Sequence, residues 1–140
     1  MTNRRLGVIV KEQDPLMLTS DDSVQHACQR MWKRRVGAVL VVDAKKQLVG
    51  IFTGRDAVRT LAEGKEPAVT KLAAAMTPNP DTIGPDRTAI EALRAMSDGG
   101  YRHLPIVQDG KILGCVSRGD FQGMELDRLE EETSLFERIG

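Results

Sequence analysis

The sequence predicts an α+β fold built from two tandem β-α-β-β-α repeats. The strongest observation is a motif that occurs twice: the segment Gly50–Asp56 (GIFTGRD) returns as Gly114–Asp120 (GCVSRGD). In both copies a short apolar strand runs through a hydroxyl residue into a helix start, and an aspartate follows the hydroxyl. The apolar segments around the two copies also come in the same order. A chain of 140 residues is long enough for two such repeats that bury their apolar faces together.

The first repeat opens with a predicted strand and a predicted helix. Leu6–Val10 is a short apolar segment that we interpret as a strand, and Asp14-Pro15 marks a turn after it. The acidic and hydroxyl cluster Asp21–Ser23 predicts the start of a helix, which ends in the basic run Lys33–Arg35. Apolar residues at i, i+3, i+4 and i+7 give this helix an apolar face, formed by Val24, Ala27, Cys28 and Met31.

The rest of the first repeat predicts a hairpin and a second helix. Val39–Val42 is a continuous β-branched run typical of a buried strand, and Leu48–Phe52 is the next strand. A helix over Arg55–Glu63 follows, with Gly64 as its C-cap. Its apolar residues lie on one side of the helix and are Val58, Leu61 and Ala62.

The second repeat shows the same order of elements. Asp81–Ile83 parallels Leu16–Leu18, and the helix that follows is closed by Gly99-Gly100. The strand His103–Val107 leads into Asp109-Gly110, which is a strong signal for a two-residue hairpin turn. The apolar residues of the helix have the spacing seen in the first repeat and are Ala89, Ala92, Leu93 and Met96.

The repeated motif has a structural and a functional interpretation. The hydroxyl of Thr53 or Ser117 caps a helix, and the aspartate in the first turn is favoured by the helix dipole. A carboxylate at this position can also accept both hydroxyls of a ribose, as the acid of dinucleotide folds does. The helix N-terminus offers donors to phosphate, and Arg55 and Arg118 are candidates for contacts to a phosphate tail.

Composition argues against several classes of function. Lys and Arg total 20 and Asp and Glu total 20, so the zero net charge argues against a nucleic-acid binder. No apolar run has the length of a membrane span, and we expect no secretory signal. Two cysteines and two histidines make a four-ligand metal site improbable, and we predict no metal. Cys28 and Cys115 are expected to be buried and inert, in a protein of the cytoplasm.

Taken together, these features resemble a pair of CBS domains, the cystathionine β-synthase domain family. The resemblance rests on the tandem repeats, the paired Gly-x-x-Thr/Ser-x-x-Asp motifs, the run Pro85–Ala89 (PDRTA) and the run Arg102–Val107 (RHLPIV). It implies a Bateman module, in which two repeats pack about a pseudo-twofold axis with a cleft for an adenosine-containing ligand on each side. Such modules often form flat homodimers and regulate a partner.

This resemblance also implies a division of the chain. We expect CBS domain 1 over residues 5–66, CBS domain 2 over residues 67–122 and a C-terminal helical extension over residues 123–140. The extension is rich in Glu and Arg, with apolar residues at helical spacing, and we expect it to dock on the module or its dimer partner. Trp32 borders the first apolar stripe, either at the edge of the core or on the dimer surface.

Ligand contacts carry over from the family residue by residue. Asp56 and Asp120 match its ribose-binding aspartates, and Thr53 and Ser117 match the hydroxyls that precede them. The strand residues that lie beside the base in the family match Ala38, Val39 and Leu40 in the first repeat, and Thr82, Ile83, His103, Leu104 and Pro105 in the second. Met17-Leu18 stands where the family often has a threonine before an apolar residue. That departure favours the second-repeat site.

Three classes of function remain open on the sequence. The favoured one is a stand-alone regulatory module, an energy sensor that binds AMP, ADP, ATP or S-adenosylmethionine, needs no cofactor and signals to a protein partner. The alternative is a dimerisation or adaptor module with the same fold and no physiological ligand. We predict no enzyme, because no nucleophile, base and orienting group lie at a suggestive spacing, and His103 is better interpreted as lining a cleft.

Overall fold

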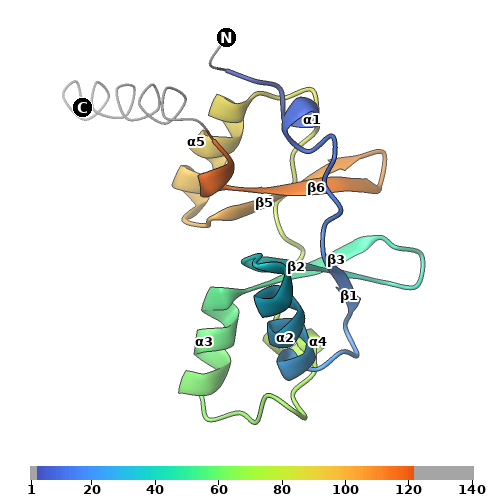
Figure 1. Ribbon diagram of the computed structural model, residues 1–140, viewed down its shortest axis with the longest axis vertical. Helices are drawn as coiled ribbons and strands as arrows, with labels where there is room; N and C mark the ends of the chain where they lie inside the picture. Colours follow the sequence, from blue (N-terminus) through green and yellow to red (C-terminus); the bar gives the residue numbers. More distant parts are fainter. Residues whose placement is uncertain (1–2, 122–140) are drawn as a thin grey trace, which may run out of the picture. The chain divides into compact units, whose positions relative to one another are not determined.

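The computed structural model describes residues 3–121 (Figure 1), so the predicted extension over residues 123–140 lies outside the described residues. Within the described part the chain divides into two compact units. The first-repeat unit contains residues 14–80 and 110–112. The second-repeat unit contains residues 3–13, 81–109 and 113–121. In the described part, no helix is long and apolar enough to cross a membrane.

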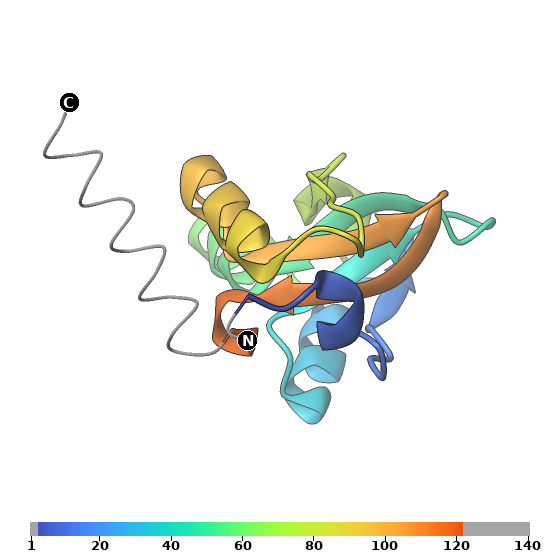
Figure 2. The ribbon, with the colours of Figure 1, turned by 90° about the horizontal axis from the view of Figure 1, so that it is seen from above.

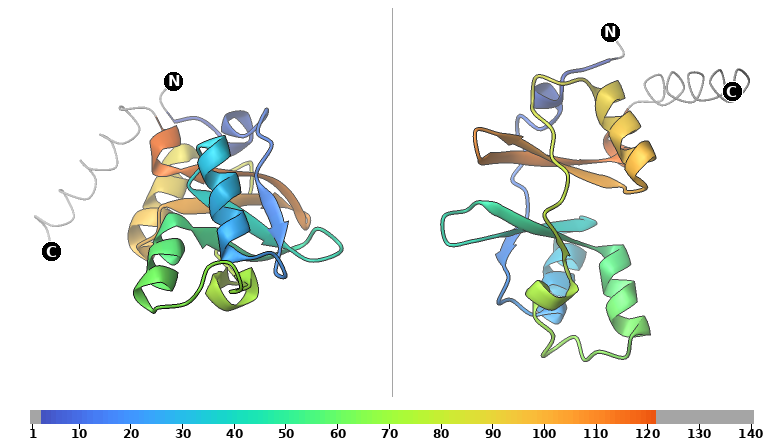
Figure 3. Two further views of the ribbon diagram at one scale, coloured as in Figure 1. Left: turned by 60° about the horizontal axis from the view of Figure 1, so that its bottom comes forward. Right: turned by 180° about the vertical axis from the view of Figure 1, so that it is seen from behind.

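The first-repeat unit is a four-stranded sheet covered on one face by helices. Its strands are β1 (Met17–Thr19), β2 (Ala38–Val42), β3 (Leu48–Thr53) and β4 (Thr77–Pro78), in that spatial order. β1 and β2 are parallel, whereas β3 pairs antiparallel with both of its neighbours. Figures 1 and 3 show the helices on one side of this sheet; they are α2 (Val24–Arg34), α3 (Gly54–Ala62) and α4 (Leu72–Ala75).

The second-repeat unit is a hairpin covered by two helices. β5 (His103–Gln108) pairs with β6 (Lys111–Ser117), and a single 3₁₀ turn over Arg118–Asp120 follows. Figure 2 shows α1 (Leu6–Ile9) and α5 (Ala89–Gly99) lying over this hairpin. The core of the unit joins α1, α5 and both strands and includes Leu6, Val10, Ala92, Leu93, Met96, Leu104, Ile106 and Val116.

Local signals in the sequence predict the ends of the helices correctly. Ser23 caps α2 by accepting a 3.0 Å hydrogen bond from the His26 N–H, and Thr88 caps α5 in the same way. Gly100 ends α5 in the left-handed conformation, with φ of 72°. The hairpin turn has positive φ at both central residues, 52° at Asp109 and 78° at Gly110. These are the values that a type I′ turn requires, and they explain the Asp-Gly pair.

The segment Leu6–Val10 is a short helix, and its assignment to a strand was wrong. The Val10 N–H donates to the Leu6 carbonyl at 3.0 Å, which places Leu6 and Val10 on the same side of the turn. Both side chains are buried in the core of the second-repeat unit, while Val8 is exposed. A five-residue apolar run fits one helical turn as well as a strand, and burial at i and i+4 decides for the helix.

Two further elements differ from their predicted form. The stretch Asp81–Ile83 forms only a single parallel bridge, between Ile83 and Ile106, where β1 of the other repeat forms a strand. In α3, Val58 and Leu61 are 67% and 64% exposed, although they were expected to form its apolar side. Asp56 and Thr60 are the buried residues of α3, so this helix packs on the sheet through its polar side.

Each unit is completed by a segment that precedes the other repeat. We call residues 3–13 the N-terminal arm and residues 67–80 the connecting arm. The Leu6 N–H donates to the Arg87 carbonyl at 2.9 Å, just before α5, and the Leu72 N–H donates to the Asp22 carbonyl at 2.8 Å, just before α2. Both leucines are fully buried in the unit that they join. The arms are therefore exchanged between the repeats.

The glycine at the start of each motif is where an arm passes over the strand. A Cβ at Gly114 would lie 2.7 Å from the Val10 Cβ and 2.7 Å from the Gln13 Oε1 of the N-terminal arm. A Cβ at Gly50 would collide with the side chain of Met76 in the connecting arm, 3.0 Å from its Cγ. The repeated glycine is thus explained by the close approach of an arm, and not by the turn that follows it.

We expect Gly114→Ala to destabilise the fold by about 1–3 kcal/mol, because Val10 cannot withdraw without moving α1. Gly50→Ala should cost less, because the flexible Met76 side chain can turn aside. Gly54→Ala is the control, since nothing lies within 4 Å of the added Cβ. Urea denaturation gives the free energy of unfolding of the three variants and so ranks their losses of stability. Equal losses for Gly114→Ala and Gly54→Ala would contradict the arm contact.

Candidate functional site

The first motif forms a closed cap at the start of α3. The Thr53 backbone N–H donates to Oδ2 of Asp56 at 2.9 Å, and the Thr53 hydroxyl donates to the same oxygen at 3.2 Å. In return, the Asp56 N–H donates to the Thr53 hydroxyl oxygen at 3.4 Å. This reciprocal arrangement is a capping box, and it satisfies donors that the first helical turn leaves unpaired. The structural interpretation of the motif therefore holds for the first repeat.

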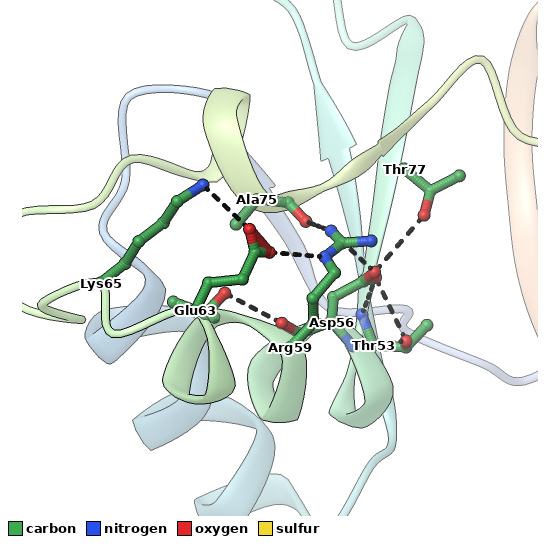
Figure 4. Close-up of polar contacts among 8 residues, drawn as sticks. Thr53, Asp56, Arg59, Glu63, Lys65, Ala75 and Thr77 are labelled. Carbon is green, nitrogen blue, oxygen red and sulfur yellow. Dashed lines mark hydrogen bonds and ion pairs between the residues drawn. The ribbon is translucent and has the colours of Figure 1, made fainter.

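The second oxygen of Asp56 is also occupied (Figure 4). The Arg59 guanidinium lies 3.3 Å from Oδ1, and the Thr77 hydroxyl donates to Oδ1 at 3.5 Å. Only 6% of Asp56 is exposed, so the residue is buried with both carboxylate oxygens in contact with donors. A ribose diol can reach this carboxylate only by displacing partners that it already has.

The second motif is open by comparison. The Ser117 N–H donates to Oδ2 of Asp120 at 2.6 Å, and the Ser117 hydroxyl donates to the same oxygen at 3.2 Å. Among the described residues nothing donates to Oδ1 of Asp120, and the residue is exposed. Within residues 3–121 this carboxylate thus has an acceptor oxygen that receives no donor, which is what recognition of a hydroxyl-bearing ligand requires.

Three arginines lie at or next to the backbone of the second motif within its own unit. Arg118 follows Ser117 directly, and its N–H donates to the Arg102 carbonyl at 3.3 Å. The Arg4 guanidinium of the N-terminal arm donates to the backbone carbonyl of Asp120 at 3.1 Å. One guanidinium, that of Arg4, thus contacts the backbone beside the exposed carboxylate, and the backbones of two further arginines run next to it. The combination suits a ligand that carries hydroxyl groups and an anionic tail.

The predicted strand residues lie beside the two motifs, each in its own unit. Ala38 and Val39 of β2 pair with Thr53 and Phe52 of β3, so they stand next to the first motif. In the other unit the Ile83 N–H donates to the Pro105 carbonyl at 3.1 Å, which brings Thr82 and Ile83 against β5. The exposure of these residues differs: Thr82 is exposed, Ala38, Ile83 and His103 are partly exposed, and Val39, Leu40, Leu104 and Pro105 are buried.

His103 of β5 and Cys115 of β6 are both partly buried in the second-repeat unit. Burial lowers the pKa of His103, and the charge of Arg102 acts in the same direction, while Asp120 opposes it. Burial raises the pKa of the Cys115 thiol to about 12, and Asp120 adds to this. Cys28 also has its pKa raised by burial. Both cysteines are free and hold their protons, so neither is an activated nucleophile.

Three residues that contact the motifs were not anticipated from the sequence. Arg59 and Thr77 close the first motif, and Arg4 reaches the second motif from the N-terminal arm. Arg59 follows Asp56 by three residues on a helix, which is a recognisable spacing for an ion pair. The other two come from the exchanged arms, and no local pattern brings an arm to a motif. The structure shows no cluster of His, Cys, Asp and Glu suited to a metal in its described residues.

The family of the chain follows from comparison with known proteins. The CBS domain family matches twice, over residues 8–63 and residues 69–123. The chain belongs to the CBS domain family. The two matches each end just beyond one copy of the Gly-x-x-Thr/Ser-x-x-Asp motif, so the repeat seen in the sequence is the family's repeat.

Curated relatives include CBS domain-containing proteins of Arabidopsis thaliana and uncharacterized proteins of prokaryotes. The Arabidopsis thaliana CBS domain-containing protein CBSCBSPB2 is 43% identical over 102 residues, which are 72% of this chain and 19% of that protein. The uncharacterized protein YlbB of Bacillus subtilis is 35% identical over 120 residues, which are 85% of this chain and 76% of YlbB. The chain spans about a fifth of the length of its Arabidopsis CBSCBSPB relatives.

Solved structures show the same fold. A CBS-domain containing protein of Agrobacterium tumefaciens is 28% identical with a TM-score of 0.78, covering 86% of this chain and 91% of that one. The CBS domain pair of protein MJ0100, solved with 5′-methylthioadenosine and S-adenosyl-L-methionine, is 25% identical with a TM-score of 0.77, covering 92% and 97%. A Pyrobaculum aerophilum CBS domain protein complexed with AMP is 20% identical with a TM-score of 0.81, covering 91% and 98%, and shares the fold.

The lowered pKa of His103 predicts a pH-dependent stability. Because folding disfavours the protonated ring, the unfolded state binds more protons as the pH falls through about 6.5. The stability due to neutral His103 is therefore present above that pH and is lost below it. Thermal melts between about pH 7.5 and about pH 5.5 should show a fall for the wild type that His103→Gln reduces. The control variant His26→Gln, at the other histidine, should show the same fall in melting temperature as the wild type. If His26→Gln also abolished this fall, His103 would not be its cause.

Proposed function

We propose that this chain is a regulatory module that binds an adenosine-containing ligand and signals to a protein partner. The ligand is an adenine nucleotide (AMP, ADP or ATP) or S-adenosylmethionine, and the module acts as a sensor of its level without catalysis of its own. Two CBS structures of similar fold are complexes with AMP and with 5′-methylthioadenosine and S-adenosyl-L-methionine, which supports this class of ligand. The two free cysteines favour the cytoplasm for this role.

One observation carries the proposal: among the described residues, nothing donates to Oδ1 of Asp120. Its counterpart Asp56 is buried with both oxygens in contact with donors, as a structural cap requires. Asp120 keeps the contact with Ser117, and its Oδ1 receives no donor from the part of the chain that the structure describes. A carboxylate with one oxygen held and one free is pre-oriented toward a hydroxyl donor. We therefore assign the stronger site to the second repeat, with Thr82, His103, Ser117, Arg118 and Asp120.

The two aspartates should separate binding from stability. Ligand at a hundred times its dissociation constant stabilises a fold by about 2.7 kcal/mol, which raises the melting temperature by roughly 3–10 °C. Asp120→Ala should abolish most of this rise and cost the free protein only about 1 kcal/mol. Asp56→Ala should keep the rise but cost about 2–3 kcal/mol, because it leaves Arg59 and Thr53 without their buried partner.

Isothermal titration with AMP, ATP and S-adenosylmethionine measures binding directly for the wild type and both variants. No heat from any of the three at millimolar concentration would contradict ligand binding and favour the adaptor. An Asp56→Ala variant that loses binding while Asp120→Ala keeps it would contradict the choice of the second-repeat site.

A homodimer is part of the same proposal. Trp32 of α2 is 87% exposed, and Val58 and Leu61 of α3 are exposed as well, on two helices that lie side by side in Figures 1 and 3. Large apolar side chains on neighbouring helices are typical of a surface that is covered in an assembly. We interpret them as the face that a second copy of the chain covers, the dimer-surface alternative for Trp32.

Light scattering at micromolar concentration should give the mass of a dimer, and Trp32→Glu with Val58→Glu should give that of a monomer. Val69→Glu is the control, because Val69 is exposed on the connecting arm, outside both helices. A monomeric wild type, or a dimer that the double variant leaves intact, would contradict this surface.

A further inference from the structure

We propose that Arg59 clamps the connecting arm to α3 and, in doing so, occupies the first motif in place of a ligand. This role goes beyond the proposed function, since the clamp exists without any ligand, and its ligand-blocking part rests on that function. The residues involved lie together in Figure 4, where Arg59 stands between Asp56 on one side and the connecting arm on the other.

The contacts of Arg59 join three parts of the first-repeat unit. Its Nη2 donates to the Ala75 carbonyl at 2.6 Å, at the end of α4, and lies 3.3 Å from Oδ1 of Asp56. Its Nε lies 3.5 Å from Oε1 of Glu63, one turn further along α3. A planar guanidinium spreads five N–H donors over three nitrogens and can serve a carbonyl and two carboxylates together, whereas a lysine offers three donors on a single nitrogen.

A residue of the connecting arm also contacts Asp56 directly. The Thr77 hydroxyl, just after α4, donates to the same Oδ1 of Asp56 at 3.5 Å. Asp56 thus holds the arm directly through Thr77 and indirectly through Arg59 and Ala75. Because Asp56 is buried, these contacts are screened less than those of a surface ion pair.

The second repeat lacks the means to build this clamp. The position that corresponds to Arg59 in the second copy of the sequence is Gly123, which has no side chain to place against Asp120. We take this difference in residue type as the origin of the contrast between the closed first motif and a second motif that is open among residues 3–121. Arg59 is therefore a positioning residue for the arm and a determinant of which motif is accessible.

Hydrogen exchange of the arm tests the clamp without any ligand. The Met76 N–H donates to the Leu72 carbonyl and the Asn79 N–H to the Val49 carbonyl, so both amides report on the arm. Arg59→Gln should speed their exchange by about threefold to tenfold, and Arg59→Lys by less. Arg55→Gln, on the same helix and with the same loss of charge, is the control. Equal exchange in Arg59→Gln and Arg55→Gln would overturn the clamp.

Titration with AMP then tests the occupied motif. The wild type should bind one AMP per chain, and Arg59→Gln should bind a second one that a further Asp56→Ala change removes. One AMP per chain in Arg59→Gln, together with faster exchange, would overturn the blocking of ligand while the clamp stands. No AMP binding to either protein would overturn the proposed function and the blocking together, and the exchange rates would still decide the clamp.

Discussion

The close passage of an arm over a strand is the constraint on which both units depend. Gly50 and Gly114 have no side chain, and a residue of an arm occupies the space where their Cβ would lie. The arm then delivers a buried leucine to the core and a backbone N–H to the segment that opens a helix. With that helix anchored, the hairpin beside it presents the hydroxyl and the aspartate at a fixed place. The glycine and the aspartate lie at the two ends of the same motif. The arm that packs against the glycine therefore also helps to fix the position of the aspartate.

Local patterns predicted the regular elements well. The apolar stripes of α2 and α5, the β-branched run of β2 and the Asp109-Gly110 turn follow from periodicity and turn chemistry, and the structure confirms them. The failures come from tertiary context. The five-residue run at Leu6–Val10 is too short for its period to distinguish strand from helix, and its partners are more than seventy residues away. The exposure of Val58 and Leu61 likewise depends on α3 packing through Asp56 and Thr60, which a hydrophobic pattern does not predict.

The sequence predicts a hydroxyl and an aspartate in each candidate site, and the ligand-binding role of these residues stays a prediction. Both copies of the motif carry a hydroxyl and an aspartate, and both form the contact between them. What separates the copies is the surroundings: a buried carboxylate held by Arg59 and Thr77 in one, an exposed carboxylate among arginines in the other. The sequence argued for the same preference from Met17, a residue on a different strand. Two unrelated features of the chain therefore support our proposal that the second repeat holds the stronger site.

The exchanged arms have a consequence for how such a chain can be divided. A fragment cut at the boundary between the repeats would keep its hairpin and lose the leucine that seals its core, Leu6 in one case and Leu72 in the other. A fragment that runs on to residue 80 keeps Leu72, because the connecting arm follows the first repeat directly, whereas the second repeat takes its leucine from residues 3–13, which lie before the first repeat. With both repeats in one chain, Leu6 reaches the second repeat as an intramolecular contact, without the loss of translational and rotational entropy that association with a separate molecule would bring.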